Sequence, residues 1–348
     1  MTIPNTGDDL TAEWFAYALG RPVRAARVEP IGVGVGLVGQ LYRVQLDGPG
    51  EPATVVVKLA GPTEESRFVP TVLNMYAREF GFYTELSPRT PIAHPATFHA
   101  AHDPATQDTV LVLEDISGRG SAFDQIVGCT LDEARPAIRV LARLHAAFWD
   151  DSQLADVAWL PRLGDDPYPV AVPMAYDMAW PRAQEFFPEL IDARVQDFGD
   201  GYSARIPGIF AKLCEGPLVL SHADWRLDNL FFAPGGDVLA VDWQLVDRSV
   251  GPRDLSYLVT QSVNIDDVSE YRRAFDEYLA DLGDLGVDAD REWAWEMYRY
   301  GTLLGFVYPI IAAGALTIDD PRHVELCRAL LRRSLRGLEA LDAFDLPA

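Results

Sequence analysis

The stretch VLSHADWRLDNLFF (residues 219–232) constrains this chain more than any other. Its apolar residues are typical of a buried strand or core segment: Val219, Leu220, Leu227, Leu230, Phe231 and Phe232. Interleaved with them are polar and charged residues that such a segment normally excludes: His222, Asp224, Arg226, Asp228 and Asn229. Burying a charge without a partner costs several kcal/mol, so buried charges are normally paired or bound to metal. The segment therefore predicts a site built around these polar side chains.

Length and composition place this segment in an ordinary globular protein. The chain has 348 residues, of which 49% are hydrophobic and 23% charged, which is enough for one large domain or two smaller ones. Its formal charge of −23 argues against nucleic-acid and anionic-membrane partners, because phosphate binding needs a basic face. Three cysteines at unrelated spacings, and an N-terminus without a basic start or apolar core, predict a cytoplasmic protein.

The order of predicted elements favours an α+β chain with two lobes. The first part mixes helices and strands: a helix over 11–19 with Thr11 as N-cap, a hairpin over 41–46 and 54–60, a helix over 68–86 and a strand over 110–116. The rest is mainly helical: a helix over 131–149, short strands over 218–220 and 239–241, and helices from about 254 to 343. We expect a small antiparallel-sheet lobe over 1–116 and a larger helical lobe over 117–348. The uncharged run 300–318 is expected to be a buried helix.

A glycine loop precedes the first strand of the predicted hairpin. IGVGVGLVG (31–39) contains the spacing Gly34-x-Gly36-x-x-Gly39, which alone is equally typical of a plain turn. In a dinucleotide-binding fold such a loop opens a helix, whereas here an alternating strand follows. A glycine loop before a strand is the arrangement that covers ATP phosphates in kinases through backbone N–H groups.

Lys58 lies in the middle of the predicted strand TVVVKLA (54–60). An edge-strand lysine that extends its ammonium into solvent is a common alternative. However, among 29 basic residues only Lys58 and Lys212 are lysines, which favours a position that needs a compact ammonium. A kinase uses such a lysine on the α- and β-phosphates, oriented by a helix glutamate. Glu79 is the preferred partner, because Glu85, six residues further on, projects from another helix face.

A further set of residues has the chemistry of a phosphoryl-transfer site. Asp242 lies in the apolar strand LAVDWQL, where a carboxylate is costly unless it binds a partner. Asn229 and Asp242 together offer hard oxygen ligands suited to Mg²⁺ that arrives on substrate phosphates. Asp224 is suited to orient an acceptor hydroxyl and take its proton. Arg226 would reach the transferring phosphoryl group, and His222 is expected to hold the loop in shape.

A two-metal hydrolase is a different interpretation of His222, Asp224 and Asp242. Such sites usually need further histidines, and the chain has six in all. His99 and His102 lie in FHAAHDPATQD, which is expected to be a surface connection between strands. No second cluster of His, Asp and Glu accompanies them in the sequence, so the hydrolase is the weaker interpretation.

Taken in order, the motifs resemble those of the aminoglycoside phosphotransferase and choline kinase-like superfamily, and within it the ecdysteroid kinase-like group. The matching stretches are the glycine loop 31–39, VVVKLA (55–60), YAREFGFYTEL (76–86), LVLEDI (111–116), LARLHAAFW (141–149), HADWRLDNLFF (222–232) and VDWQLVDRSVGPRDLSYL (241–258). They span most of the chain up to residue 258. The two aspartate-containing motifs carry most of the specificity.

The resemblance implies a protein kinase-like fold that binds ATP between its two lobes. Lys58 and Glu79 would be the pair that positions the phosphates. Backbone groups of Glu114 and Ile116, in the LEDI hinge, would meet the adenine. Because the glycine loop contains no Ser or Thr, its contacts with phosphate would be made by the backbone alone.

The resemblance also implies roles for the aspartate-containing motifs. Asp224 would be the catalytic base, Asn229 and Asp242 the Mg²⁺ ligands, and Asp254 the residue that braces the catalytic loop from below. The family usually has His-Gly-Asp where this chain has Ala223 before its aspartate. Alanine is accepted at that position unless the backbone needs a positive φ.

The expected activity is transfer of the γ-phosphate of ATP to a hydroxyl of a small molecule, with Mg²⁺. A protein kinase would carry a longer activation segment closed by APE, but only eleven residues separate Asp242 from Asp254, so a small acceptor is favoured. The alternative is a non-catalytic, nucleotide-binding pseudokinase. Such a protein normally lacks the lysine, the base or a metal ligand, and all of them are present here. The sequence leaves the acceptor and the oligomeric state open.

Overall fold

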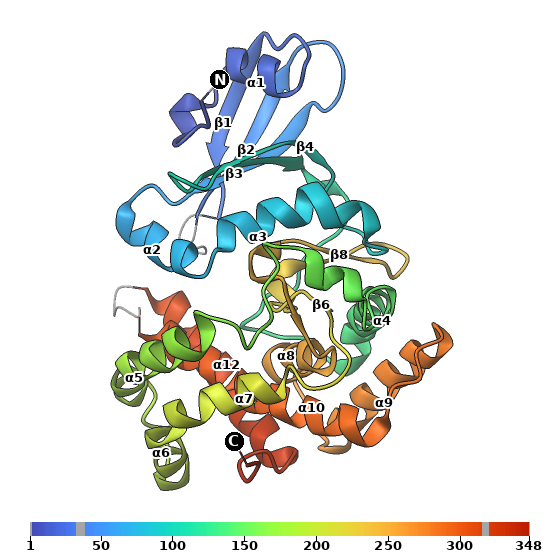
Figure 1. Cartoon of the computed structure of the whole chain (residues 1–348). Helices are drawn as coiled ribbons and strands as arrows, with labels where there is room; N and C mark the ends of the chain where they lie inside the picture. The colour runs from blue at the N-terminus through green and yellow to red at the C-terminus, as the bar shows by residue number, and fades with distance from the viewer. Residues whose placement is uncertain (1, 33–38, 315–319, 348) are drawn as a thin grey trace. The chain divides into compact units, whose positions relative to one another are not determined.

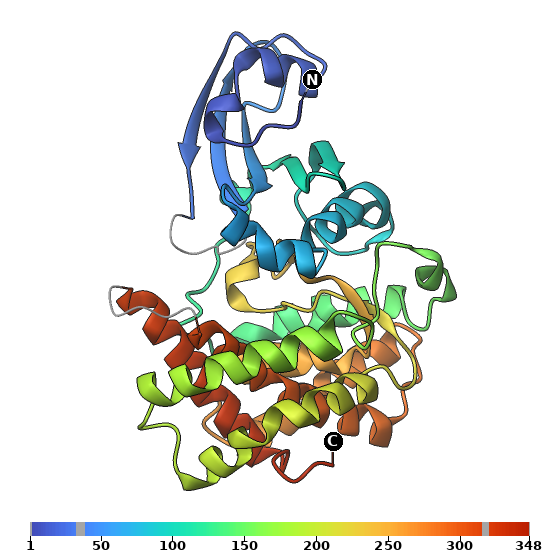
Figure 2. The same cartoon turned by 60° about the vertical axis from the view of Figure 1, so that its left-hand side comes forward.

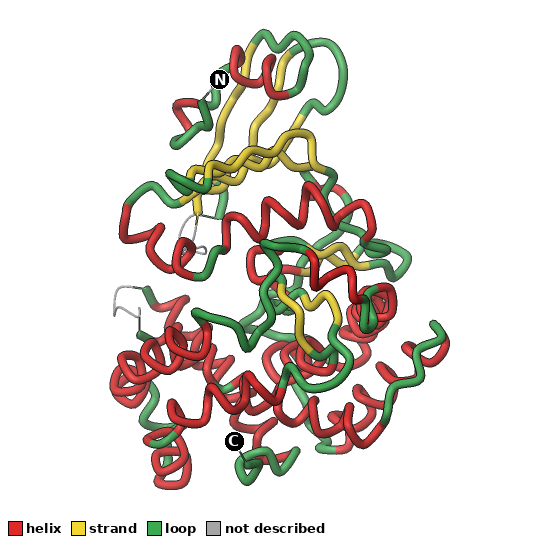
Figure 3. Tube along the Cα trace, viewed as in Figure 1, coloured by secondary structure: helices red, strands yellow, loops and turns green. Residues whose placement is uncertain are grey.

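The structure, a computed structural model, describes residues 2–32, 39–314 and 320–347. The chain divides into two compact units (Figure 1). The first is Met1–Gly120 together with Leu239–Leu245, and the second is Ser121–Val238 together with Val246–Ala348. The larger sheet lies in the first unit, whereas the second is mainly helical (Figure 3). The predicted α+β class, with a small antiparallel sheet and a larger helical part, is confirmed.

The first unit is built on a five-stranded antiparallel sheet in the order β1-β2-β3-β5-β4. Its strands are β1 (Ala25–Pro30), β2 (Gly39–Asp47), β3 (Thr54–Ala60), β4 (Thr97–Asp103) and β5 (Asp108–Glu114). β2, β3 and β5 each place valine on one face, and Val44, Val55 and Val57 are fully buried in one core, because β-branched side chains suit a pleated, buried surface. The predicted hairpin is the pair β2–β3.

A short helix near the N-terminus packs against this sheet. α1 (Ala12–Ala18) begins after Thr11, whose hydroxyl accepts a hydrogen bond from the Trp14 backbone N–H. This is an N-cap contact that satisfies one of the free N–H groups at a helix start. The predicted helix and its cap are confirmed, and Phe15 anchors the helix in the core of the sheet.

The helical structure predicted over 68–86 is confirmed, but it is not one continuous helix. The chain instead forms α2 (Glu64–Val72), α3 (Met75–Gly81) and a π-helical turn after α3. Asn74, between the two helices, has a φ of 54°, a left-handed conformation that asparagine tolerates better than most residues. That residue ends α2 and lets α3 start in a new direction.

His99 and His102 lie in strand β4, not in a surface connection as predicted. β4 is an edge strand that pairs only with β5 in the described sheet. Its residues are half-buried or exposed along its whole length. The strand therefore carries a weak hydrophobic pattern, and the connection itself is limited to the turn that follows Asp103.

The second unit is built from helices packed around α8. The helices are α4 (Leu131–Ala147), α5 (Tyr168–Phe186), α6 (Ala193–Asp200), α7 (Ile206–Lys212), α8 (Pro252–Ser262), α9 (Ser269–Asp284), α10 (Arg291–Gly305), α11 (Val307–Ala313) and α12 (Pro321–Ala340). α8 packs against α10 and α12 and is buried at every residue. Figure 2 shows the long helices α5 (green) and α12 (red) of this unit.

Four short strands lie between α7 and α8 in the sequence. β6 (Val219–Ser221) pairs antiparallel with β9 (Asp247–Ser249), and β7 (Leu230–Phe232) and β8 (Val238–Ala240) lie between them in sequence. The described part of the uncharged run 300–318 forms the buried end of α10 and the whole of α11. Among the described residues, no helix has both the length and the hydrophobicity needed to cross a membrane.

Candidate active site

Lys58 is the only lysine of the first unit, and it binds two carboxylates. Its neighbours Val57 and Leu59 on β3 point into the core, so the alternation of the strand directs Lys58 to the opposite face of the sheet. There its Nζ lies 2.7 Å from Glu79 Oε2 and 2.7 Å from Asp242 Oδ1. Its side chain is only 17% exposed, so it does not extend into solvent.

Asp242 reaches Lys58 because residues 239–245 pack into the first unit. Trp243 stacks on Phe82, with ring centroids 3.7 Å apart and an interplanar angle of 6°. The carbonyl of Leu245 accepts a hydrogen bond from Arg78 on α3. Asp242 itself has a φ of 64°, a left-handed conformation that costs free energy for any residue but glycine. Packing on both sides therefore holds this strained residue in place.

Burial dominates the electrostatics of this cluster. It raises the pKa of Glu79 to about 7, with Lys58 acting in the opposite direction and Asp242 adding to the increase. Burial alone would lower the pKa of Lys58, but the carboxylates of Asp242 and Glu79 raise it above its ordinary value. Lys58 is therefore protonated at neutral pH and lies between the carboxyl groups of Glu79 and Asp242, and these two groups stabilise its charge.

The glycine loop is described only at its end. Gly34 and Gly36 lie outside the described residues. Gly39 opens β2 opposite Ala60, and a Cβ at Gly39 would lie 2.7 Å from the carbonyl oxygen of Leu59. Glycine is required there because the two backbones approach too closely for a side chain.

Glu114 and Ile116 lie at the end of β5, where the first unit ends. The Glu114 backbone N–H donates to the Ala96 carbonyl at 2.8 Å, and its carboxylate pairs with Arg119 at 2.9 Å. Ile116 begins a short 3-10 turn capped by the Asp115 carboxylate. The backbone N–H of Glu114 is thus committed within the sheet.

In the second unit, Asp254 holds the loop that follows β6. Its carboxylate accepts hydrogen bonds from the Ser221 hydroxyl (2.7 Å) and from the backbone N–H groups of His222 (2.8 Å) and Ala223 (3.0 Å). The ring of His145 on α4 lies 3.3 Å from the same carboxylate. Burial alone would raise the pKa of Asp254, but these partners, with His145 first, lower it to about 2.

Ala223 has a φ of 65° in this loop. The position therefore does need a positive φ, and the alanine found here in place of the usual glycine is strained. His222, beside it, is fully buried, and its Nδ1 accepts a hydrogen bond from the Asp224 backbone N–H at 3.3 Å. His222 thus shapes the turn that presents Asp224.

The Asp224 carboxylate is contacted by the side chains of Asn229 and Arg226. Asn229 Nδ2 donates to its Oδ2 at 2.7 Å, and also to its carbonyl oxygen at 3.0 Å. Arg226 places its Nε 3.1 Å from Asp224 Oδ1 and its Nη1 3.2 Å from Asp228 Oδ2. Burial raises the pKa of Asp228, although Arg226 acts against this. The polar residues of the opening stretch are therefore paired mainly with one another and with Asp254.

The structure brings the sequence-derived residues together in two sets. Lys58, Glu79 and Asp242 form one ionic cluster in the first unit, and Asp224 with Asn229 forms the centre of a hydrogen-bonded loop in the second. Asn229 and Asp242 belong to different units.

Sequence reasoning missed two contributors to these sets. Gln244 lies 3.4 Å from Lys58 Nζ and 3.3 Å from Asp242 Oδ2, and His145 contacts Asp254. His145 stands in the quoted motif LARLHAAFW, so a histidine inside an otherwise apolar helix face was the available signal for it.

Each of the two residues expected from the sequence to bind Mg²⁺ has suitable donor atoms on its own side chain. Asn229 and Asp242 carry the oxygen atoms that Mg²⁺ prefers. Because Asn229 uses its Nδ2 toward Asp224, its Oδ1 is the atom left for a metal. Within the described residues, no group of three or more His, Cys, Asp or Glu side chains is arranged to hold a metal, so Mg²⁺ would need the phosphate oxygens of a nucleotide to complete its coordination.

Comparison with known proteins agrees with the sequence resemblance. The model of the ecdysteroid kinase-like family matches residues 34–149, which include Lys58 and Glu79. No curated protein matches the sequence significantly. Together with the solved structures described next, this match confirms the predicted resemblance to the ecdysteroid kinase-like group.

Solved structures with the same fold come from several kinases. A protein from Ralstonia eutropha assigned as an aminoglycoside phosphotransferase has a TM-score of 0.57 at 14% identity, covering 95% of this chain and 97% of the other. The amicoumacin kinase in complex with AMP-PNP, Ca²⁺ and its substrate has a TM-score of 0.55 at 15% identity, with 90% and 88% covered. Choline kinase from Cryptosporidium parvum has a TM-score of 0.55 at 12% identity, covering 91% of this chain and 90% of the other. The chain therefore has the fold of kinase-like small-molecule phosphotransferases.

Proposed function

We propose that this protein is a Mg²⁺-dependent phosphotransferase that moves the γ-phosphate of ATP to a hydroxyl group of a small molecule. The observation that carries the proposal is the buried cluster of Lys58, Glu79 and Asp242. It assembles one cation and two carboxylates from three separate segments of the chain, which is the set of parts that kinases use on nucleotide phosphates. Burying three charged groups costs desolvation free energy, and an apolar cluster in the same place would stabilise the fold at least as well. The charges are therefore better explained by function than by stability.

The first unit supplies the nucleotide-binding residues in this proposal. Lys58, oriented by Glu79, contacts the α- and β-phosphates, and the backbone of the glycine loop at Gly34, Gly36 and Gly39 covers them. The solved amicoumacin kinase holds the ATP analogue AMP-PNP, which supports nucleotide binding by this fold.

The hinge after β5 receives the adenine. The Glu114 N–H is already donated to Ala96, so Glu114 has its carbonyl to offer to the base. Ile116 is then the residue whose N–H would meet a ring nitrogen. This assigns the two hinge residues different hydrogen-bonding roles, one as acceptor and one as donor.

The second unit supplies the catalytic loop. The acceptor oxygen attacks the γ-phosphorus, the bond from that phosphorus to the β,γ-bridging oxygen breaks, and the acceptor proton passes to the Asp224 carboxylate, so that the products are the phosphorylated acceptor and ADP. Arg226, beside Asp224, offsets the negative charge of the transferring group. Mg²⁺ bound by Asn229 and Asp242 would neutralise charge on the phosphates.

The acceptor is a small molecule with a hydroxyl group. Solved proteins of the same fold include an amicoumacin kinase and a choline kinase, which act on unrelated compounds. The fold therefore supports the class of acceptor and not its identity.

The first experiment measures binding of AMP-PNP by calorimetry with and without Mg²⁺. In the wild type we expect Mg²⁺ to raise the affinity about tenfold or more, because the ion screens phosphate charge against nearby carboxylates. Asp242→Asn should lose this dependence on Mg²⁺. Asp47→Asn is the matched control, since Asp47 lies in the same unit with its side chain 63% exposed, and it should bind as the wild type does.

A second step separates catalysis from binding. Asp224→Asn should bind AMP-PNP normally but lower the rate of ATP hydrolysis about 100-fold or more, because a positioned base is removed. If the folded wild type binds no nucleotide, the proposal is wrong. Mg²⁺-dependent binding without any ATP turnover would identify the pseudokinase alternative instead.

A further inference from the structure

Helix α12 is rich in arginine, although the chain as a whole is strongly acidic. The helix contains five arginines and two glutamates, whereas the chain carries a formal charge of −23. Arg332 and Arg336 are four residues apart, so their side chains lie on the same face of the helix. Both are exposed. Like charges at this spacing repel each other and destabilise a helix, so an anion beside them stabilises this face of α12.

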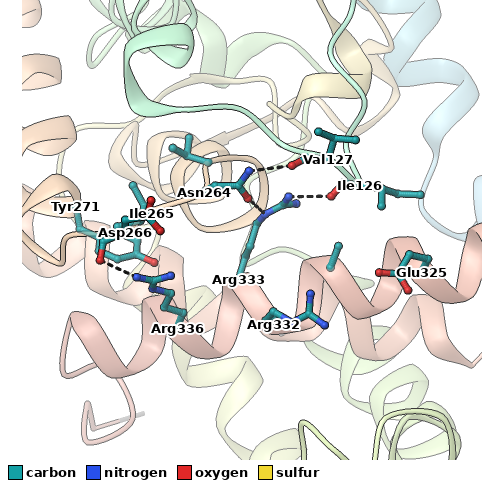
Figure 4. Close-up of a pocket in the computed structure, with 12 residues that line it drawn as sticks. Ile126, Val127, Asn264, Ile265, Asp266, Tyr271, Glu325, Arg332, Arg333 and Arg336 are labelled. Atoms are coloured by element: carbon teal, nitrogen blue, oxygen red, sulfur yellow. Dashed lines mark hydrogen bonds between the residues drawn. The ribbon is translucent and has the colours of Figure 1, made fainter.

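These two arginines line a cavity of about 350 Å³ in the second unit (Figure 4). Arg333 also lines the cavity, and the acidic residues on its lining are Asp266 and Glu325. The Glu325 carboxylate is paired with Arg328, which is not part of the lining, at 3.2 Å. The cavity therefore keeps an excess of positive charge. Its volume lies in the range of small-molecule sites, about 300–1,000 Å³.

Arg333 fixes the wall of this cavity. Its guanidinium donates hydrogen bonds to the carbonyls of Gln125, Ile126 and Gln261. A Cβ at Gly128 would collide with the same guanidinium, and Gly128 has a φ of 74°. Only glycine allows the backbone before α4 to approach the arginine so closely. Because Arg333 is occupied by these carbonyls, the other two arginines are the cations available to a ligand.

Three side chains on the lining have donors to offer to such a ligand. Among the described residues, the Arg332 guanidinium forms no hydrogen bond or ion pair. Arg336 donates from Nη2 to the Asp266 carbonyl at 2.8 Å and has further N–H groups to offer. The Tyr271 hydroxyl makes no hydrogen bond with another described residue. Burial raises the pKa of Tyr271 to about 12, with the charge of Arg336 acting in the opposite direction, so the phenol remains a neutral donor near that guanidinium.

We propose that this cavity binds a small organic molecule that carries a phosphate group. Arg332, Arg336 and the Tyr271 hydroxyl donate to the phosphate oxygens, since a guanidinium has paired donors whose geometry matches phosphate. The organic part of the ligand packs against the apolar residues of the lining: Ile126, Val127, Val263, Ile265 and Ala329. The lining shares no residue with the candidate active site, so the inference stands whether or not the proposed function is correct.

The test is a calorimetric titration of the full chain with phenyl phosphate at low salt, where screening of exposed charges is weak. We expect the wild type to bind phenyl phosphate about tenfold more tightly than inorganic phosphate, because the ring buries apolar surface. Benzoate, which has the ring but a carboxylate of lower charge, should also bind about tenfold more weakly. Equal affinities for phenyl phosphate and inorganic phosphate would overturn the organic part of the proposal, and equal affinities for phenyl phosphate and benzoate would overturn its phosphate part.

Substitutions in the lining decide where the probe binds. Arg332→Gln and Arg336→Gln should each weaken binding of phenyl phosphate about tenfold, and Tyr271→Phe about fivefold, because each removes a hydrogen bond to the phosphate. Arg139→Gln is the matched control. Arg139 is an exposed arginine of α4 that does not line the cavity, and its replacement should leave the affinity unchanged.

Three results would overturn the proposal as a whole. The first is a wild type that binds no phenyl phosphate at about 10 mM. The second is an unchanged affinity in both Arg332→Gln and Arg336→Gln, which is expected if the probe binds at the nucleotide-binding residues instead. The third is an equal loss in Arg139→Gln, which would show a general effect of charge. Because Arg332 and Arg336 are exposed, their variants should unfold in urea at the wild-type midpoint without the probe, which separates a loss of affinity from a loss of folding.

Discussion

At the scale of single residues, Ala223 has a backbone that alanine rarely adopts. Its φ of 65° is imposed by Asp254, which binds the N–H groups of His222 and Ala223 together. An alanine in the left-handed region costs about 1–2 kcal/mol, whereas glycine is free of this cost. Asp242 has a similar φ of 64°, so strained residues occur in both sets of candidate site residues, as is common at functional sites.

We predict that Ala223→Gly increases the free energy of unfolding by about 0.5–1 kcal/mol. The relief of strain exceeds the conformational entropy that glycine gains in the unfolded chain. Urea denaturation followed by tryptophan fluorescence measures the change. Ala280→Gly is the control, because Ala280 is exposed within α9, where glycine should cost about 1 kcal/mol. If Ala223→Gly and Ala280→Gly lowered the free energy of unfolding by the same amount, the backbone at Ala223 would not be strained.

At the scale of elements, the sequence predicted the helices and strands that have a strong local hydrophobic pattern. The hairpin β2–β3 follows from the alternation over 41–46 and the apolar run over 54–60, and α4 follows from its helical spacing; the capping box formed by Thr130 and Glu133 marks its start in the structure. β4 was missed because an edge strand is half-exposed and its pattern is weak. The break between α2 and α3 was missed because it depends on the left-handed backbone of Asn74, which hydrophobic spacing does not report.

Arg333 is one of several arginines that tie helix α12 to the rest of its unit. Arg333 Nη1 donates to the carbonyls of Gln125 (2.8 Å) and Gln261 (3.1 Å). Its Nη2 donates to the Ile126 carbonyl at 2.9 Å, and its Nε to Asn264 Oδ1 at 3.0 Å. Figure 4 shows this side chain beside a cavity of about 350 Å³. Arg333 therefore joins the segment before α4, the end of α8 and α12.

We predict that Arg333→Met lowers the free energy of unfolding by about 2–4 kcal/mol, because four acceptors, three of them in partly buried hydrogen bonds, lose a charged donor. Arg332→Met is the matched control. Arg332 lines the same cavity but is exposed, and its replacement should change stability by less than about 0.5 kcal/mol. Urea denaturation of both variants checks the prediction, and similar losses in the two would contradict it.

At the scale of the whole molecule, the candidate site is assembled from segments that are distant in the sequence. Lys58 and Asp242 are 184 residues apart, yet both belong to the first unit because Trp243 stacks on Phe82. The sequence predicted which residues have suitable chemistry, since charges within apolar strands are conspicuous. It did not predict that Gln244 joins the lysine cluster or that His145 contacts Asp254, because long-range packing leaves no local pattern.

In the second unit, the loop that follows β6 is held by the buried carboxylate of Asp254. Asp254 has a pKa of about 2 in the folded protein, below its ordinary value of 3.8. A depressed pKa means that the ionised group stabilises the fold, by about 2 kcal/mol here. This contribution is fully present above pH 4 and is lost as the pH falls from about 4 to 2.

We therefore predict that Asp254→Asn lowers the free energy of unfolding by about 2 kcal/mol or more at pH 7, and that the difference from the wild type shrinks below pH 4. Urea denaturation at pH 7, 5, 4 and 3 measures it. Asp284→Asn, at an exposed position near the end of α9, is the control for the loss of one negative charge and should show little difference at any of these pH values. A difference for Asp254→Asn that stays constant from pH 7 to 3 would mean that the ionised carboxylate is not what holds the loop, and that the geometry around Asp254 is maintained by packing alone.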